Sequence, residues 1–404
     1  MSLRSRMPRH PGALVLVLLA MSAVLVATLG HEHRGRDGSS AAGPSSPDRP
    51  GPTSAASLPG PPGAHAPPGA HAPPGAHAPH GAHAPHDEGD PRPGPWGRAL
   101  AAGIRPVPAT QPGKLRFGLG PALDSALASP LAGNLDFLTT WYNGPGDLSF
   151  LRKWRADLIP EVYRSGHGIH LVVWLDGTGS VGTFQTSHGP ACGREYPLSG
   201  AFLTDARELA SIFAGPANGP ALYVTLFTEL QTYPCQSNEW AATPETTNYY
   251  RALQDRYLAT QEIFHAGAPN ARVSLGWGGW QSRWDDPVKG GGRSLITHFA
   301  DVLRASDFQS FQAMGNDSNA ADVRNMTKLL GQYGPVMVAH FKSGSQAAWD
   351  ADMHALLAGD EVRKLSLDGL FAFSFMDQSN INFSPQALAT ARGAVQSHGV
   401  RSSY

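Results

Sequence analysis

The feature that most limits the fold of this chain is the alternation of strand-like and helix-like segments in its C-terminal part. Short apolar runs typical of buried strands recur between longer stretches with helical spacing of apolar residues. Eight such runs over this length predict an α/β fold, the (β/α)8 barrel. The predicted strands are Leu115–Gly120, Leu135–Tyr142, Ile169–Asp176, Leu222–Glu229, Val273–Trp277, Phe308–Met314, Val336–Lys342 and Gly369–Met376.

Helices are predicted between these strands. The first must be brief, around Ser125 to Leu131, because the first two strands lie close together in sequence. Gly166 and the pair Gly334–Pro335 follow predicted helices, as helix-ending residues commonly do. The other predicted helices are Leu148–Arg164, Thr204–Phe213, Thr246–His265, Ser294–Ala305, Ala321–Tyr333, Ala347–Leu357 and Pro385–Gln396.

Residues 1–30 have the pattern of a targeting segment. Arg4, Arg6 and Arg9 precede an uncharged apolar run from Ala13 to Leu29, which is the arrangement of an export signal. The run is at the short end of the range for a membrane-spanning helix, so a cleaved signal peptide and an uncleaved membrane anchor (residues 13–29) both fit. We expect the rest of the chain to be secreted or anchored to the outer face of the cytoplasmic membrane, where disulfides form.

Residues 31–112 are predicted to be a disordered linker. From Gly63 to His86 the chain repeats GAHAPP, GAHAPP, GAHAPH and GAHAPH. Proline at this density favours extended segments, and the linker has too little apolar surface to offset the entropy of ordering. Its clustered histidines admit a second interpretation, weak metal binding or pH-dependent charging. We expect a tether that is dispensable for the folding of one domain, residues 113–404.

Composition excludes several classes of function. The 31 Lys plus Arg and 32 Asp plus Glu give a net charge of -1, which argues against a nucleic-acid partner. Two cysteines are too few for a disulfide-built scaffold or a four-cysteine zinc site. The sequence contains no phosphate-binding glycine loop, metal-spaced histidine pair or nucleophile elbow. We therefore expect no cofactor or metal. We also expect a monomer.

Three of the predicted strands end in or near a carboxylate, namely Asp176, Glu229 and Asp377. Active sites of such barrels lie at the C-terminal ends of the strands. Because strands four and eight lie opposite each other, Glu229 and Asp377 can face one another, as the two carboxylates of glycoside hydrolysis do. Each can also be structural, for example by capping a following loop.

Side-chain alternation predicts which residues point into the barrel. In the third strand, Ile169, Leu171, Val173 and Leu175 should face the helices, which turns His170, Val172, Trp174 and Asp176 inward. In the fourth strand, Leu222, Val224 and Leu226 should face the helices, which turns Tyr223, Thr225, Phe227 and Glu229 inward.

Aromatic residues gather at or just beyond the predicted strand ends. Flat aromatic faces pack against the apolar faces of sugar rings while neighbouring polar side chains bond the hydroxyls. Any one of these aromatic residues can equally belong to the core. The predicted substrate-binding residues are Trp141, Tyr142, Trp174, Tyr233, Trp240, Trp277, Trp280, Asn316 and His340.

The two cysteines lie in neighbouring loops of the predicted barrel. Cys192 follows the third strand and Cys235 follows the fourth. In an oxidising exterior we expect them to form a disulfide. This bridge would hold the loops on both sides of Glu229.

Three passages of the domain resemble the secreted glycoside hydrolases of family 26, the β-mannanase group, and through it the clan A barrels. They are LYVTLFTELQTYPCQSNEW (222–240), NYYRALQDRYLATQEIFHAGAPNARVSLGWGGW (248–280) and GPVMVAHFKSG (334–344). The resemblance implies a (β/α)8 fold and a polysaccharide substrate. It also implies an acid/base role for Glu229, which matches the glutamate that ends the family's fourth strand.

Two positions depart from the family pattern. His340 stands where the family has its strand-seven nucleophile glutamate, and Thr228 stands where a histidine usually precedes the acid/base residue. Three interpretations follow. The protein is a rewired hydrolase that uses Glu229 with Asp377 or Asp176, or it is a non-catalytic carbohydrate-binding barrel, or the strand-seven register differs from the predicted one. We expect an extracellular glycoside hydrolase that uses carboxylate general acid catalysis, with the binding barrel as the alternative.

Overall fold

The computed structural model describes residues 105–175, 178–236, 243–285, 294–315, 319–375 and 378–403. All of them belong to one compact unit, Asp87–Tyr404. The predicted targeting segment and most of the predicted linker lie outside the described residues. Within the described ranges, no helix combines the length and the apolar character that crossing a membrane requires.

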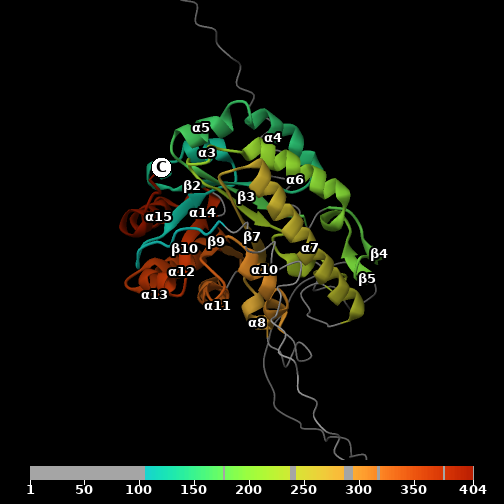
Figure 1. The fold of residues 1–404 in the computed structure, drawn as a ribbon. Coiled ribbons are helices and arrows are strands. Elements are labelled where there is room, and N and C mark those ends of the chain that lie inside the picture. Colours follow the sequence, from blue (N-terminus) through green and yellow to red (C-terminus); the bar gives the residue numbers. More distant parts are fainter. Residues whose placement is uncertain are drawn as a thin grey trace, which may run out of the picture. The chain divides into compact units, whose positions relative to one another are not determined.

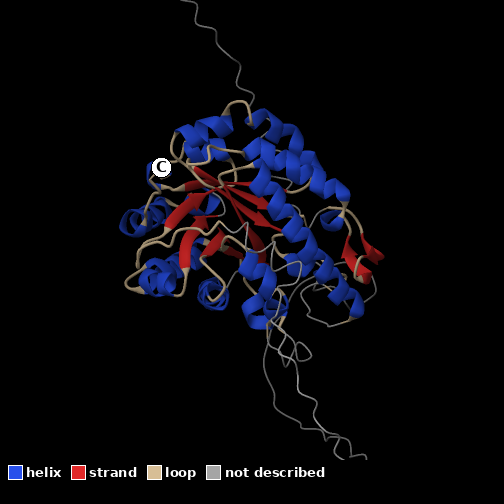
Figure 2. Cartoon of the chain, viewed as in Figure 1, coloured by secondary structure: helices blue, strands red, loops and turns tan. Residues whose placement is uncertain are grey.

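Eight parallel strands close into a barrel, which confirms the predicted (β/α)8 fold. Neighbours around the barrel follow the order β1-β10-β9-β8-β7-β6-β3-β2, and helices surround the strands (Figures 1 and 2). The strands are β1 (Arg116–Leu119), β2 (Phe137–Tyr142), β3 (Gly168–Val173), β6 (Leu222–Leu226), β7 (Ala271–Gly278), β8 (Gln309–Ala313), β9 (Val336–Phe341) and β10 (Leu370–Phe375).

Each predicted helix has a counterpart in the structure, although two are divided, and the helices 281–284, 361–367 and 378–381 were not predicted. The predicted helix 148–164 is split, because the Asp157 side chain accepts from the Leu158 backbone N–H and starts a new helix there. The predicted helix 294–305 is interrupted at Phe299, which packs on Trp277 with ring centroids 5.5 Å apart. The larger helices are α3 (Leu123–Leu127), α4 (Leu148–Trp154), α5 (Leu158–Arg164), α6 (Gly200–Phe213), α7 (Pro244–Gly267), α10 (Ala300–Ala305), α11 (Asn319–Gly331), α12 (Gln346–Leu357), α13 (Glu361–Leu367) and α15 (Pro385–His398). Shorter ones are α8 (Gln281–Trp284), α9 (Leu295–His298) and α14 (Gln378–Ile381).

An antiparallel hairpin that the sequence analysis did not predict follows β3. It consists of β4 (Val181–Thr186) and β5 (Gly189–Arg194) and packs beside α7 (Figure 1). The ring of Phe184 lies 6.2 Å from that of Tyr249 on α7, and the Tyr249 hydroxyl donates to the Arg194 carbonyl. Because β4 is mostly exposed, it lacks the apolar alternation that marks a strand in sequence.

Side chains fill the barrel interior in layers. The lowest layer is apolar, with Phe137, Tyr223, Phe308, Met337 and Phe371 in one buried cluster. Above it, hydrogen-bonded polar side chains come from six strands. They are Thr139, His170, Thr225, Ser274, Ser310 and Ser374, joined by contacts of 2.7–3.5 Å.

The predicted side-chain directions hold for β3 and fail in one place after β6. Ile169, Leu171, Val173 and Leu175 belong to the core between strands and helices, as predicted. Phe227 also belongs to that core, 5.3 Å from Phe202 on α6, whereas the alternation predicted that it points inward. The cause is its backbone, which has a φ of 55° and leaves the extended conformation that alternation requires.

The packed chain reaches further toward the N-terminus than the predicted boundary at Gly113. Val107 is buried in the apolar cluster of the barrel's lower end. The Arg105 backbone N–H donates to Oδ1 of Asp307 at 2.5 Å, and its guanidinium donates to the carbonyls of Pro269 and His265 at 2.6 and 2.9 Å. Residues 105–107 are therefore part of the barrel's base.

Candidate active site

Glu229 lies directly beyond the C-terminal end of β6, in an unusual backbone conformation. Its φ is 59°, and Phe227, two residues earlier, has a φ of 55°. Within the described ranges these are the two non-glycine residues with positive φ. Such conformations are disfavoured and persist where the surrounding structure enforces them, often at functional sites. The backbone therefore singles out this strand end.

Buried contacts hold the strained segment in place. The Tyr233 hydroxyl donates to the Thr228 carbonyl at 3.2 Å and accepts from the Leu175 N–H at 3.1 Å, which ties the ends of β6 and β3 together. Gly276 on β7 permits the close approach of this segment, since a Cβ there would lie 2.8 Å from Cα of Thr228. The position of Glu229 is thus set by three neighbouring strands.

Gln312, at the end of β8, connects Glu229 to His340. Its side-chain Nε2 donates to Oε1 of Glu229, and its Oε1 lies 3.2 Å from Nδ1 of His340. His340 is on β9, the seventh strand of the barrel in chain order. The structure therefore places His340 at the mouth, next to the carboxylate-bearing end of the fourth strand.

Aromatic rings surround His340. Its imidazole stacks on Trp141 with centroids 4.5 Å apart and an interplanar angle of 21°. The Trp174 ring lies 6.1 Å from that of Trp141, and the His170 ring lies 6.2 Å from that of His340. Burial lowers the pKa of His340 to about 3. The imidazole is therefore neutral near pH 7.

Several polar atoms at these strand ends are buried without a hydrogen-bond partner among the described residues. They are Nε2 of His340, the indole Nε1 atoms of Trp141 and Trp174, and Oγ1 of Thr228. Buried polar groups in folded proteins are normally paired, so each such atom needs an explanation. Their positions, at the C-terminal ends of β9, β2, β3 and β6, coincide with the place where barrel enzymes bind their ligands.

The structure brings together four of the predicted site residues: Glu229, His340, Trp141 and Trp174. Trp280, half-buried just beyond β7, packs over Gly278. Three others lie in the core between strands and helices, fully buried, and do not belong to this site: Tyr142, Tyr233 and Trp277. Asp176, Asp377, Trp240 and Asn316 lie outside the described residues.

Gln312 is the central residue of the site that was not predicted from the sequence. The sequence pattern indicates its direction. Phe311 and Ala313 face the helices, so Ser310 and Gln312 point inward at the end of a predicted strand. Alternation in β8 would have identified it.

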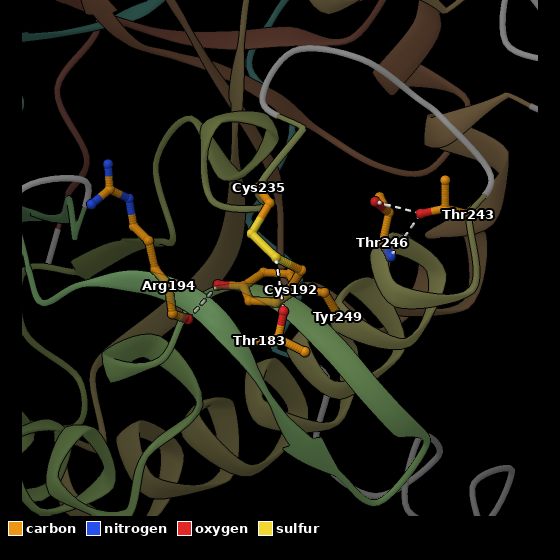
Figure 3. The surroundings of a disulfide bond; sticks show 7 residues. All are labelled: Thr183, Cys192, Arg194, Cys235, Thr243, Thr246 and Tyr249. Atoms are coloured by element: carbon orange, nitrogen blue, oxygen red, sulfur yellow. Dashed lines mark hydrogen bonds between the residues drawn. A yellow bond between two sulfur atoms is a disulfide. The ribbon is translucent and has the colours of Figure 1, made fainter.

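The predicted disulfide between Cys192 and Cys235 is present, with the two Cα atoms 5.4 Å apart (Figure 3). It joins β5 of the hairpin to the segment that follows Glu229. Two backbone hydrogen bonds run beside it, from Cys235 N–H to the Cys192 carbonyl at 3.2 Å and from Arg194 N–H to the Tyr233 carbonyl at 3.0 Å. The bridge therefore reinforces the support of the strained strand end.

Replacing both cysteines by alanine is expected to loosen this segment more than the barrel. The bridge closes a chain separation of 43 residues, and losing such a constraint costs roughly 2–4 kcal/mol of unfolding free energy. Hydrogen exchange followed by mass spectrometry should show faster exchange in 190–194 and 228–236, with the barrel strands still protected. Thr183→Val, next to the bridge, is the matched control and should exchange as wild type. Equal loss of protection in all strands would contradict the expectation.

Two surface hollows lie away from this mouth. One of about 520 Å³ is bounded by the β4–β5 hairpin and α7, and one of about 400 Å³ lies between α12 and α15. Neither is lined by a predicted site residue or by Gln312. The strained backbone and the unpaired polar atoms both favour the barrel mouth as the site.

No family model matches this sequence, and no curated protein matches it. Solved structures do match the fold. A psychrophilic family 10 endo-β-1,4-xylanase is 13% identical, with 69% of this chain and 96% of that chain covered and a TM-score of 0.47. The xylanase XynB from Paenibacillus barcinonensis is 11% identical (69% and 89% covered, TM-score 0.42), and the β-mannanase from the blue mussel Mytilus edulis is 11% identical (70% and 91%, 0.41). At identities and TM-scores this low, the likeness carries no information about function.

Proposed function

We propose that this chain is an exported glycoside hydrolase that cleaves a polysaccharide with Glu229 as the general acid. The observation that carries the proposal is the placement of Glu229. It is a half-buried carboxylate on strained backbone at the end of the fourth barrel strand, and Gln312 orients one of its oxygens. A general acid must be held in position relative to the bond that it protonates. The resemblance to family 26 assigns the same role to this residue.

The aromatic residues at the mouth suit a sugar ligand. Trp174 and Trp280 are half-buried, so part of each indole is exposed at the ends of β3 and β7. Indole faces pack against the apolar C–H faces of pyranose rings, and the polar atoms beside them bond the hydroxyls.

The chemistry at the neutral His340 favours inversion over retention. A retaining enzyme needs a carboxylate nucleophile on the opposite side of the sugar from the acid. Here the strand-seven position holds the imidazole of His340. Burial lowers the pKa of this group to about 3, so the imidazole carries no charge. In the proposed reaction, Glu229 gives its proton to the glycosidic oxygen as the bond from the anomeric carbon to that oxygen breaks. The oxygen of a water molecule bonds to the same carbon, and the water's proton goes to Asp377 or Asp176.

His340 also favours a second candidate function. A barrel that has exchanged its strand-seven carboxylate for a buried imidazole could bind a polysaccharide without cleaving it. Export is part of both proposals, and its support is the basic and apolar pattern of residues 1–30.

The proposed function is tested by incubating the purified chain with soluble xylan, mannan, galactan and mixed-linkage glucan. We expect release of reducing ends from at least one of them, and the anomeric proton signals of the first product should show inversion. Binding to the same polysaccharides is measured in parallel by affinity electrophoresis. Binding without release of reducing ends would replace the hydrolase by the carbohydrate-binding barrel.

A further inference from the structure

The hydrogen bonds of Gln312 determine which nitrogen of His340 carries its hydrogen. An amide NH2 group can only donate, and an amide oxygen can only accept. Since Nε2 of Gln312 donates to Oε1 of Glu229, its Oε1 is the atom that faces Nδ1 of His340, 3.2 Å away. Nδ1 must therefore carry the hydrogen. In a neutral imidazole this leaves Nε2 as an acceptor with a bare lone pair.

This acceptor is buried and has no hydrogen-bond partner among the residues that the structure describes. Trp141 does not account for it, because a stacked ring covers the face of the imidazole while the Nε2 lone pair lies in the ring plane. His170, one layer deeper in the barrel, is a structural histidine, and both of its ring nitrogens have hydrogen-bond partners. Its Nδ1 lies 3.3 Å from Thr139 Oγ1 and its Nε2 lies 2.9 Å from Thr225 Oγ1.

Two further unpaired groups at the mouth bear on the chemistry of this partner. The indole N–H groups of Trp141 and Trp174 are donors, and they too have no partner among the described residues. The Trp141 ring stacks on His340, and the Trp174 ring lies against that of Trp141. A hydroxyl both accepts and donates, so it satisfies such a mixed set. A carboxylate cannot donate to Nε2, and it would be repelled by Glu229 when that group is ionised.

We propose that the mouth selects a neutral sugar, one hydroxyl of which donates a hydrogen bond to Nε2 of His340, with Gln312 fixing the required tautomer. The inference rests on the proposed function only in taking the mouth to be a sugar-binding site, since it needs no cleavage. His340 is then a specificity-determining residue.

The first test measures affinity in a background that leaves the ligand intact. In full-length Glu229→Gln protein, isothermal titration calorimetry is run with xylohexaose, mannohexaose, cellohexaose and, as the acidic probe, trigalacturonate. We expect at least one neutral oligosaccharide to bind more tightly than the acidic one. Adding His340→Phe, which preserves the stack on Trp141, should weaken that binding roughly five- to hundredfold, the cost of an unmade buried hydrogen bond.

The matched control is His167→Asn in the same background, because His167 precedes β3 at the end opposite the mouth and its ring nitrogens lie 2.7 Å from Ser165 Oγ and 2.8 Å from the Ala132 carbonyl. It removes a buried imidazole whose two nitrogens are already paired, so it should lower the melting temperature and leave the oligosaccharide affinity unchanged. The proposal would be overturned if Glu229→Gln protein bound the neutral oligosaccharide with the same affinity with and without His340→Phe. Tighter binding of trigalacturonate, or no binding of any neutral oligosaccharide, would also overturn it.

The second test reads the tautomer in a protein whose His340 is intact. Histidine-selective ¹⁵N labelling and NMR identify the His340 signals as those absent from His340→Phe. We expect a protonated Nδ1 and a bare Nε2, and an Nε2 signal that moves toward the hydrogen-bonded range when the neutral oligosaccharide is added. A protonated Nε2, or a signal that the oligosaccharide leaves in place, would overturn the proposal even if His340→Phe did not fold.

The outcomes separate this inference from the proposed hydrolysis. Binding that depends on His340, in a chain that releases no reducing ends, keeps the inference and removes the hydrolase. Release of reducing ends at the same rate by His340→Phe keeps the hydrolase and removes the inference.

Discussion

Glu229→Gln is expected to lower kcat for polysaccharide hydrolysis by roughly 10²–10⁴-fold, the usual contribution of a general acid. The amide has the same shape as the carboxyl group and can still accept from Gln312, so the strained segment should keep its conformation. What it lacks is an acidic proton for the leaving oxygen. We therefore expect KM and the melting temperature to change little. The measurement is initial-rate kinetics of reducing-end release on the polysaccharide that the screen identifies.

Glu208→Gln is the matched control. Glu208 lies on α6 and makes an ion pair with Arg152 on the protein's surface, away from the mouth. Surface ion pairs contribute little to stability, so this variant should keep wild-type kinetics and stability. Glu229→Gln with wild-type kcat would remove the general acid role from this residue.

The same assay distinguishes the two candidates for the base. Asp176 and Asp377 follow the third and eighth barrel strands in sequence. If one of them accepts the proton of the attacking water, its change to asparagine should lower kcat by a factor comparable to that of Glu229→Gln, while the other variant keeps most of the activity. Equal and small effects of both would show that neither is the base.

The strands were predictable because each is a buried apolar run, and parallel strands covered by helices have that pattern. The hairpin β4–β5 was not, because it packs on α7 through few apolar residues and otherwise faces solvent. Phe227 was assigned to the wrong side for a different reason. The alternation of inward and outward side chains requires extended backbone. The positive φ values at Phe227 and Glu229 could not be predicted from the sequence.

Where position on a strand determines side-chain direction, the structure brings the predicted site residues together at the mouth. Glu229, Trp141 and Trp174 were assigned to the mouth from their strand-end positions, and His340 from the resemblance to family 26. Tyr142 and Trp277 also end strands, yet they are one residue out of phase with the inward set and pack on the helices. The Tyr142 hydroxyl, for example, donates to Asp205 on α6. An aromatic residue near a strand end does not reveal which side it takes unless its phase is known.

Removing residues up to 112 is expected to destabilise the barrel by about 3–5 kcal/mol relative to a chain that begins at Arg105. Burying Val107 contributes about 1.5–3 kcal/mol. The four hydrogen bonds of Arg105 and Val107 to Asp307 and to backbone carbonyls contribute about 0.5 kcal/mol each, because three of them are exposed or only partly buried. Urea unfolding of the two truncated chains gives the difference directly. A chain that begins at Arg105 should match the full exported chain, since the repeat and its flanks contribute no apolar pattern.

Point variants separate the effect of packing from that of chain length. Val107 is buried in the cluster with Phe308 and Phe371, so Val107→Ala should lower the unfolding free energy by roughly 1–2 kcal/mol. Pro108, its exposed neighbour, is the control, and Pro108→Ala should have almost no effect. Equal stability of the chains that begin at 105 and at 113 would restore the boundary predicted from sequence. That prediction placed the boundary where a periodic apolar pattern begins, but Val107, a single apolar residue between two prolines, packs in the barrel's lower cluster without forming such a pattern.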